Sequence, residues 1–340
     1  MKLSSLGYKS ELIFTSFDGK VEDRDSYLVM RTLTNPNFFW GNLLIFDRPP
    51  KPGDFKSWVS QFKKEFPDPR IYHVTLGWDS NDGTSGDVSE FLENGFELEI
   101  KAVLSASSVI KPPKFNEYLV VRPITSDDEW SQMVNLQVES AHDNLPPEEW
   151  RKFYESQKRR YQAMTKASLG HWYGGFLEGR LVAGLGIFHR EGIGRFQSVC
   201  TSPHYRRQGL CGTLVYLSAL HAFDVMGAKD LVMCADPDYY AIKIYESVGF
   251  KKVQTEHGVY WWDRSHDSKQ ATESYIQASL ETKRLALEPV HEGHDVHGLA
   301  EKMGMAQIDL VKNADVFKGS TSDGFVFSKK FETTKESRDS

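Results

Sequence analysis

The chain has 340 residues, of which 40% are hydrophobic and 26% are charged, and its formal net charge is −6. At about 150 residues per domain this length predicts about two domains, and the composition is that of a globular protein with a sizeable core, which excludes a wholly disordered chain. The net negative charge also argues against the broad basic surface of a nucleic-acid-binding protein.

Three cysteines, Cys200, Cys211 and Cys234, are an odd number, and their spacing fits neither a disulfide framework nor a zinc site. Cys200 and Cys234 fall on neighbouring predicted strands, where small buried thiols are a simpler interpretation than a redox pair. The first ten residues contain no apolar run of the kind found in signal peptides, and no window is apolar enough to cross a bilayer. We therefore expect a soluble, cytoplasmic protein without nucleic-acid or membrane partners.

The first third of the chain is predicted to consist of strands with helices between them. Runs rich in β-branched, aromatic and leucine residues predict strands at residues 10–15, 27–33, 42–46 and 71–76. Prolines fill the loop at residues 47–54, and the apolar residues of 55–66 recur at helical spacing. Asp54 is placed to cap that helix.

A linker is predicted between this region and the next. A short helix from Val88 ends at Gly95, and a further strand follows it. Pro112, Pro113 and Lys114 then interrupt both helix and sheet, because proline lacks the N–H group that either structure uses.

A second unit is predicted to start with a strand near residue 118 and a helical stretch that ends near residue 167. The pattern then predicts strands at 171–177, 180–189 and 195–201, a helix at 209–226, a strand at 231–235, a helix at 239–248, and further strands from 250 onward and at 258–262. This order of elements indicates a mixed α/β unit.

The last 75 residues have a different character. Residues 266–340 are rich in Ser, Thr, Lys and Glu, and they allow one strand at 284–290, one helix at 295–303 and a frayed tail at 332–340. The histidines at 291, 294 and 297 are spaced by three, which spreads them around a helix, so we favour a solvated segment over a metal site. We assign this region no fold and the chain no metal.

The strongest chemical signal is the turn between residues 199 and 215. A strand runs into a turn rich in Arg and Gly, and this turn opens into an amphipathic helix. The first N–H groups of a helix have no partner within it and carry partial positive charge, so they bind phosphate. Gly209 and Gly212 let a ligand approach the backbone, and Arg206 and Arg207 add positive charge. The pattern is neither a P-loop nor a dinucleotide-binding motif.

At these residues the sequence resembles the GNAT family of acetyl-CoA-dependent N-acetyltransferases, whose pyrophosphate loop reads Arg/Gln-x-x-Gly-x-Gly/Ala. Here Arg206-Arg-Gln-Gly209-Leu-Cys211 matches it, with Cys211 where Gly or Ala is usual. Cys is small, so we expect the loop to be kept. By resemblance the N–H groups that hold the CoA pyrophosphate are those of Gln208, Gly209, Leu210, Cys211, Gly212 and Thr213, and we count Arg206 and Arg207 as cofactor-binding residues for their charge.

A second motif lies downstream. Residues 238–250 resemble the family pattern Asn-x-x-Ala-x-x-x-Tyr-Glu-x-x-Gly-Phe, with Asp238 in place of the Asn. The resemblance makes Asp238 a cofactor-binding residue and Tyr245 the general acid that protonates the departing CoA thiolate. It also implies that the strand before the loop pairs through its backbone, at Val199 and Thr201, with the pantetheine arm. The fold implied is α/β of the α+β type, with a mixed, mostly antiparallel central sheet flanked by helices.

The N-terminal third carries an echo of this second motif. Residues 90–96 and 244–250 both end in Gly-Phe, and aligning them places Phe91 opposite Tyr245. The helix before residue 90 is introduced by the proline-rich loop, whose prolines lack the N–H groups that a phosphate needs. We interpret the N-terminal third as a degenerate GNAT-like unit that has lost both the CoA loop and the proton donor. Chance recurrence of a Gly-ended helix before a strand is the alternative.

We therefore predict a degenerate GNAT-like domain at residues 1–115, an acetyltransferase domain at 116–265 and an unassigned segment at 266–340. The chain would be either a monomer in which the two units form an internal pseudo-dimer, or a homodimer.

The resemblance predicts an N-acetyltransferase that moves an acetyl group from acetyl-CoA to a primary amine of a small molecule or peptide by direct transfer. The general base is not identified, because an ordinary hairpin or surface role is favoured for each candidate: His171, Glu178, His189 and Glu191. A non-catalytic acyl-CoA-binding or protein-interaction module is the alternative function. Transfer of a longer acyl group also stays open.

Overall fold

The computed structural model describes residues 1–264 apart from residues 33, 37, 81 and 142–146. Its helices are α1 (Leu6–Asp18), α2 (Asp54–Glu65), α3 (Ser89–Glu93), α4 (Asp127–Ser140), α5 (Pro147–Lys166), α6 (Leu210–Asp224) and α7 (Ala241–Ser247), with short 3₁₀ turns at Phe39–Gly41 and Pro203–Tyr205. Its strands are β1 (Lys20–Asp23), β2 (Tyr27–Arg31), β3 (Leu43–Phe46), β4 (His73–Trp78), β5 (Glu97–Ala106), β6 (Val120–Pro123), β7 (Gly170–Leu177), β8 (Arg180–Arg190), β9 (Ile193–Thr201), β10 (Asp230–Ala235) and β11 (Lys251–Trp262).

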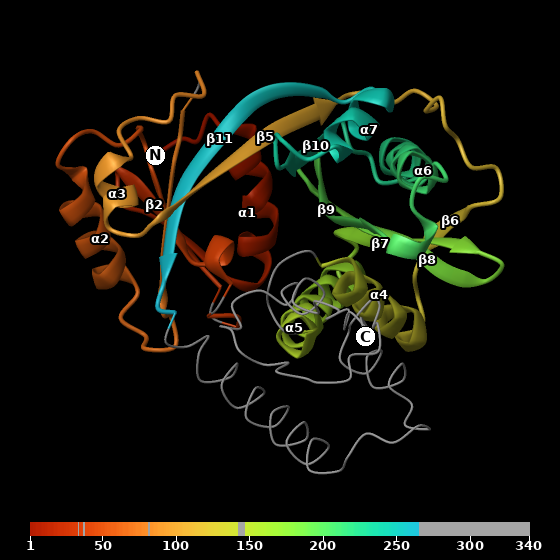
Figure 1. The fold of residues 1–340 in the computed structure, drawn as a ribbon, viewed down its shortest axis with the longest axis horizontal. Coiled ribbons are helices and arrows are strands. Elements are labelled where there is room, and N and C mark those ends of the chain that lie inside the picture. The colour runs from red at the N-terminus through yellow and green to blue at the C-terminus, as the bar shows by residue number, and fades with distance from the viewer. Residues whose placement is uncertain (33, 37, 81, 142–146, 265–340) are drawn as a thin grey trace, which may run out of the picture. The chain divides into compact units, whose positions relative to one another are not determined.

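The described strands form one sheet in the order β1-β2-β3-β4-β11-β5-β10-β9-β8-β7-β6. Within it β3 pairs with β4, and β9 with β10, in parallel, while the other neighbours in the described sheet run antiparallel. A mixed, mostly antiparallel sheet flanked by helices confirms the predicted fold class (Figure 1). The strand, helix, tail and histidine run predicted beyond residue 266 lie outside the described residues.

The predicted strand at residues 10–15 is wrong, because these residues lie in α1. The Ser5 side chain caps this helix by accepting a hydrogen bond from the N–H of Tyr8 at 3.3 Å. Tyr8, Ile13 and Phe14 are buried, Tyr8 in one hydrophobic cluster and Ile13 and Phe14 in another, so α1 is covered on more than one side. A short apolar run fits a buried strand and a buried helix equally well, so periodicity alone did not separate the two.

The order of elements repeats along the chain. The series β3-α2-β4-α3-β5 recurs as β9-α6-β10-α7-β11, with a parallel strand pair around the first helix of each series. The last strand of each series is exchanged: β5 pairs with β10, and β11 pairs with β4. These two long strands also pair with each other, and Figure 1 shows them running side by side through the middle of the sheet. The division of the chain near residue 115 and the GNAT character of the N-terminal unit stay predictions.

Helices cover both faces of the C-terminal strands. Trp172 and Tyr173 are neighbours on β7 and point to opposite faces because side chains alternate along a strand. Trp172 packs with residues of α1, α4 and α5, whereas Tyr173 packs with residues of α6 and α7. In the N-terminal half, α2 and α3 pack through Trp58, Phe62 and Phe91 on β2, β3 and β4. Among the described residues, no helix has the length and apolar character that crossing a bilayer requires.

Candidate functional site

The turn before α6 has the shape of an anion-binding site. Gly209 is the N-cap of α6 and has a left-handed backbone, with φ of 78°. Arg207 also has positive φ, at 63°. The first N–H groups of α6 therefore point out of the helix toward the turn, where the positive end of the helix dipole attracts an anion. The Arg206 Nε donates to the carbonyl of Thr201 at 3.4 Å, which holds that side chain across the turn.

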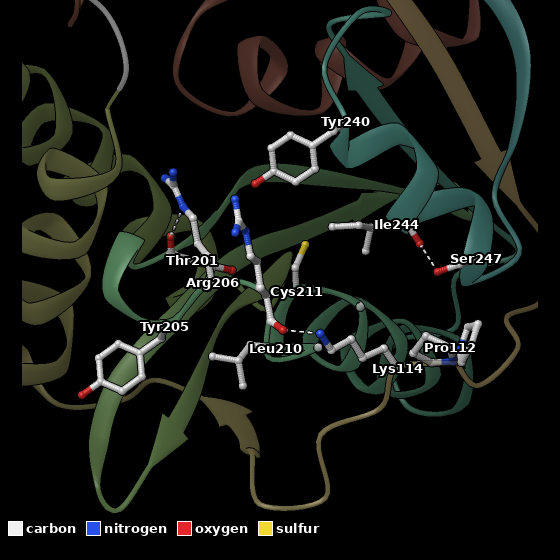
Figure 2. Close-up of a pocket in the computed structure, with 14 residues that line it drawn as sticks. Pro112, Lys114, Thr201, Tyr205, Arg206, Leu210, Cys211, Tyr240, Ile244 and Ser247 are labelled. Carbon is white, nitrogen blue, oxygen red and sulfur yellow. Dashed lines mark hydrogen bonds between the residues drawn. The ribbon is translucent and has the colours of Figure 1, made fainter.

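A cavity of about 600 Å³ lies at this helix terminus (Figure 2). Its walls come from the end of β9, the turn, the start of α6, the segment before β6, and α7 with the residue that precedes it. The residues that line it are Pro112, Pro113, Lys114, Thr201, Tyr205, Arg206, Arg207, Gly209, Leu210, Cys211, Gly212, Tyr240, Ile244 and Ser247.

Most of the loop residues singled out from the sequence meet in this cavity wall. They are Thr201, Arg206, Arg207, Gly209, Leu210, Cys211 and Gly212. Burial raises the pKa of the Cys211 thiol to about 12, so this side chain is a neutral, small wall residue at physiological pH. Cys211 stands where the family pattern has Gly or Ala, and Gly209, two residues before it, takes the left-handed backbone from which α6 starts.

Five other predicted residues lie outside the cavity wall: Val199, Gln208, Thr213, Asp238 and Tyr245. Val199 packs against the core under α6. The Thr213 side chain is fully buried and accepts a hydrogen bond from the N–H of Asn116 at 2.8 Å. Only the backbone N–H of Thr213 is therefore a candidate donor to a bound anion. Asp238 is exposed in the turn before α7, where its own N–H donates to Asp236 at 2.8 Å.

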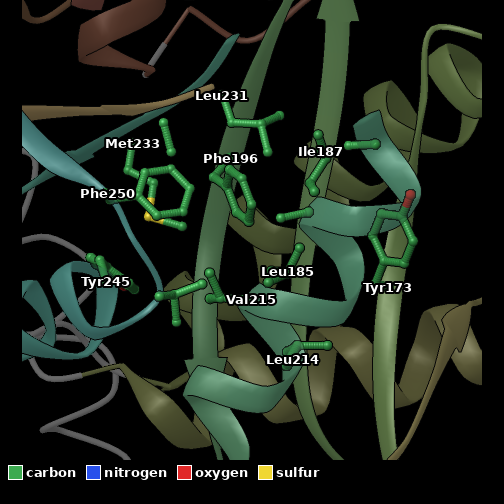
Figure 3. Close-up of a cluster of buried hydrophobic side chains, with 14 of the residues drawn as sticks. Tyr173, Leu185, Ile187, Phe196, Leu214, Val215, Leu231, Met233, Tyr245 and Phe250 are labelled. Carbon is green, nitrogen blue, oxygen red and sulfur yellow. The ribbon is translucent and has the colours of Figure 1, made fainter. Parts of the chain in front are cut away.

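Tyr245 lies in the hydrophobic core with 7% of its surface exposed (Figure 3). Burial, and then the nearby Cys211, raise the pKa of this phenol well above its usual value. The phenol therefore keeps its proton at physiological pH and is available as a hydrogen-bond donor. Its neighbour on α7, Ile244, is the side chain that lines the cavity.

The parallel strands β9 and β10 separate beside the cavity. β9 and β10 pair only as far as Arg195 and Val232, although β9 continues to Thr201. The register between β8 and β9 shifts beyond Gly184, and Ser198 takes a left-handed φ of 46°. A bulge of this kind bends a strand and redirects its N–H groups. The sequence analysis missed this bulge, because it has no Gly or Pro to signal it.

The four residues considered as bases lie elsewhere. Glu178 and Glu191 occupy two-residue hairpin turns, each with positive φ and each followed by a glycine with positive φ. Their position is the hairpin role that the sequence analysis favoured. Burial lowers the pKa of His189, and burial followed by the charges of His221 and His189 lowers that of His171. His171 packs against the ring of His221, near the far end of α6 from the cavity.

Several cavity residues were not predicted from the sequence, and all of them except Tyr205 lie in segments away from the turn. These are Tyr205, Tyr240, Ile244, Ser247 and the linker residues Pro112, Pro113 and Lys114. A Pro-Pro-Lys run signals only an irregular segment, and nothing in it indicates which element it packs on.

Burial raises the pKa of Cys234 to about 11 and that of Cys200 to about 12, so neither thiol is activated. Among the described residues, no cluster of three or more His, Cys, Asp or Glu side chains could hold a metal ion.

Comparison with known proteins identifies the segment that carries this site. A family model described as the acetyltransferase (GNAT) family matches residues 130–250. A search of curated proteins found no match. Among solved structures, a functionally unknown conserved protein from Staphylococcus epidermidis has a TM-score of 0.59 at 12% identity, covering 72% of this chain and 95% of its own. A GCN5-related N-acetyltransferase from Kribbella flavida has a TM-score of 0.52 at 14% identity, covering 75% and 93%.

At these identities the structural likeness shows a shared fold, and the family model carries the assignment. The matched segment contains the turn before α6, the cavity residues of α6 and α7, and Tyr245. Residues 130–250 are therefore an acetyltransferase domain of the GNAT family.

Proposed function

We propose that the protein transfers an acetyl group from acetyl-CoA to a primary amine of a small molecule or peptide by direct transfer. The observation that carries this proposal is the cavity at the N-terminus of α6, with Arg206 and Arg207 in its wall, inside the family segment. A diphosphate fits this place because the helix N-terminus and two guanidinium groups supply positive charge in a chain that is acidic overall.

Two further features support the transfer step. The unpaired stretch of β9 beyond Arg195 offers backbone groups to the pantetheine arm, and an N–H at the bulge near Ser198 would stabilise the negative charge that develops on the thioester oxygen. Tyr245 would donate a hydrogen bond to the departing thiolate. Because the pKa of its buried phenol is well above that of a thiol, hydrogen bonding is favoured over complete proton transfer.

Isothermal titration of the purified chain with acetyl-CoA tests the first step. Thiol release is then measured with amines, polyamines, amino acids and peptides as acceptors. We expect Tyr245→Phe to lower kcat about 100-fold with little change in KM for acetyl-CoA, which is the size of one hydrogen bond to the charged thiolate that forms only in the transition state. Tyr173→Phe is the matched control, since it removes another buried phenol from the same core, where the hydroxyl contacts His221.

A non-catalytic acyl-CoA-binding module is the second candidate. It is favoured by one observation: within the described part of the cavity wall there is no carboxylate or imidazole to serve as a base. Binding of acetyl-CoA without turnover on any acceptor would support this second function. Failure to bind acetyl-CoA would contradict both. If a longer acyl-CoA competes more strongly than acetyl-CoA, the donor in the proposal is wrong.

A further inference from the structure

The segment between β5 and β6 crosses the turn before α6 and bonds to its backbone. The Lys114 ammonium donates to the carbonyl of Arg207. The side-chain amide of Asn116 donates to the carbonyl of Gln208 at 3.0 Å, and the N–H of Asn116 donates to the hydroxyl of Thr213 at 2.8 Å. Residues 112–116, here called the linker segment, therefore hold the turn through two successive carbonyl groups and the first turn of α6.

The linker segment also accounts for both glycines of the turn. A Cβ atom at Gly209 would lie 2.4 Å from the carbonyl oxygen of Lys114, and one at Gly212 would lie 3.3 Å from the Cβ of Pro112. The first distance is far inside van der Waals contact and involves a backbone atom, so it cannot be relieved by a side-chain rotation. The sequence analysis expected these glycines to admit a ligand; in the structure it is the protein's own backbone that approaches them.

The position of the linker segment is set by the exchanged strand. β5 is anchored between β10 and β11, and after it the N–H of Ile110 donates to the carbonyl of Val248, at the end of α7, at 2.9 Å. The Phe115 ring then packs edge-on against Tyr216 of α6, with ring centroids 6.1 Å apart. Contacts at both ends thus fix the segment over α6 and α7.

Lys114 brings a positive charge into the cavity wall beside Arg206 and Arg207. Figure 2 shows its side chain extended to the backbone of the turn. An ammonium group has three N–H donors, and the Arg207 carbonyl takes one of them. The other donors can bind an anion that sits over the helix N-terminus.

We propose that the linker segment is part of the cofactor site, with Lys114 as a direct phosphate ligand and Asn116 as a positioning residue that keeps the turn in its anion-binding shape. This inference rests on the proposed binding of CoA. It extends that proposal because it assigns a cofactor-binding role to a segment that lies before the family match at residue 130. Since the segment follows β5, the N-terminal half would influence CoA affinity through it.

The experiment compares single variants of the full chain by isothermal titration with CoA and with pantetheine, which lacks the phosphates. We expect Lys114→Met to weaken CoA binding about tenfold, the size of one charge-assisted hydrogen bond, and to leave pantetheine binding unchanged. Lys111→Met is the matched control. Lys111 carries the same charge and lies just before the linker segment. Its ammonium pairs with Glu117 and lies over the Phe115 ring, rather than bonding to the turn before α6. We expect it to change CoA affinity less than twofold.

The positioning role has its own readout. Asn116→Ala is expected to raise KM for acetyl-CoA about fivefold at unchanged kcat, because it loosens one neutral hydrogen bond to the turn without touching the reacting atoms. Lys114→Arg keeps the charge and should recover part of the affinity lost in Lys114→Met. Raising the salt concentration should narrow the difference between Lys114→Met and the parent chain.

Failure of the proposed function and failure of the inference about the linker segment give different results. If the parent chain does not bind CoA, the proposed function fails and the inference with it. If the parent binds CoA and Lys114→Met binds it equally well, or loses pantetheine to the same extent, the linker segment is not a phosphate ligand and the proposed function stands. A fall in kcat alone for Asn116→Ala would contradict the positioning role.

Discussion

The turns that precede α2 and α6 both end in a glycine with a left-handed backbone, but different groups lie beside the two helix termini. Each helix begins after a glycine with a left-handed backbone, Gly53 with φ of 87° and Gly209 with φ of 78°. At α2 the next residue is Asp54, whose carboxylate accepts hydrogen bonds from the Arg48 guanidinium at 2.6 and 3.0 Å. At α6 the next residue is Leu210, and a cavity lies beside it.

The N-terminal turn is thus occupied by an anion of its own chain. The Asp54 carboxylate also accepts from the N–H of Lys51 at 2.7 Å. The prediction that Asp54 caps this helix is wrong, because Gly53 is the N-cap and Asp54 is the first residue of α2. The strands show the same contrast. β3 and β4 stay paired up to Phe46 and Trp78, whereas β9 and β10 separate beyond Arg195. In the N-terminal half the Trp58 ring stacks on the Phe46 ring, with ring centroids 3.7 Å apart. The comparison teaches that the two turns differ in what lies beside the helix terminus, a carboxylate of the same chain at α2 and a cavity at α6.

The largest effect is expected from removing one half. A chain of residues 116–264 lacks β5, which lies between β10 and β11, so these strands lose their neighbour and the fully buried Ala102, Val103 and Leu104 are missing from the sheet. We expect this fragment to show no cooperative unfolding and no CoA binding. Thermal unfolding followed by circular dichroism checks this expectation. A monomeric fragment that melts cooperatively would show that the exchanged strand is dispensable.

Exchanging the two glycines for alanine sharpens the comparison. In Gly209→Ala the Cβ meets the Lys114 carbonyl, and we expect CoA affinity to fall at least about tenfold because the turn must move. In Gly53→Ala no atom lies within 4 Å of the Cβ, so we expect only a loss of about 1 kcal/mol in the free energy of unfolding from the left-handed backbone. Titration calorimetry and urea unfolding measure the two quantities. Equal CoA affinities in the two variants would refute the distinction.

The aligned aromatic residues provide a third test. Phe91 is 1% exposed and packs edge-on against Phe55 and Phe96. Phe91→Tyr restores the residue type of Tyr245, and we expect it to cost about 2 kcal/mol of stability, because the added hydroxyl is buried among apolar rings. No acetyl transfer should be gained. Stability unchanged from that of the parent chain in urea would mean that the hydroxyl finds a partner.

The smallest effect is expected on stability, from removing the charge of the Asp54 carboxylate. Hydrogen bonding to Arg48 lowers the pKa of Asp54 below its usual value. A carboxyl whose pKa is depressed by folding stabilises the protein above its unfolded pKa of about 3.9 and loses this effect as the pH falls through the folded pKa. We expect Asp54→Asn to be about 1 kcal/mol less stable than the parent at pH 7, discounted for partial exposure, and the difference to shrink below about pH 4. Urea unfolding at both pH values measures it. A difference that does not depend on pH would assign the loss to packing.

Much of the fold is predictable from the sequence, because local patterns reflect local physics. The helix from 209 and the strands at 171–177 and 180–189 have unambiguous periodicity, and the structure places α6, β7 and β8 there. The segment at 10–15 failed because its apolar run is too short to separate helix from strand. The bulge at Ser198 was missed because a bulge depends on the pairing with β8, which the sequence of β9 alone does not reveal.

The candidate site divides in the same way. The turn before α6 could be singled out because its Gly and Arg residues lie within seven consecutive positions, 206–212, and these residues line the cavity. Lys114 and Tyr240 were not readable, since they reach the cavity only after the chain has folded across long sequence separations. Tyr245 was identified by its motif, and the structure adds that its phenol is buried and protonated.

The sequence by itself determined the resemblance to the GNAT family, the fold class and the Arg- and Gly-rich turn before α6, because each of these depends on residues that are close together along the chain. Only the tertiary structure decided that β5 and β11 are exchanged, that the N-terminal turn holds Asp54, and that the linker segment lies on Gly209 and Gly212. The physical reason is that strand pairing and close packing join residues far apart in sequence, and no local pattern specifies which partner fills a given space.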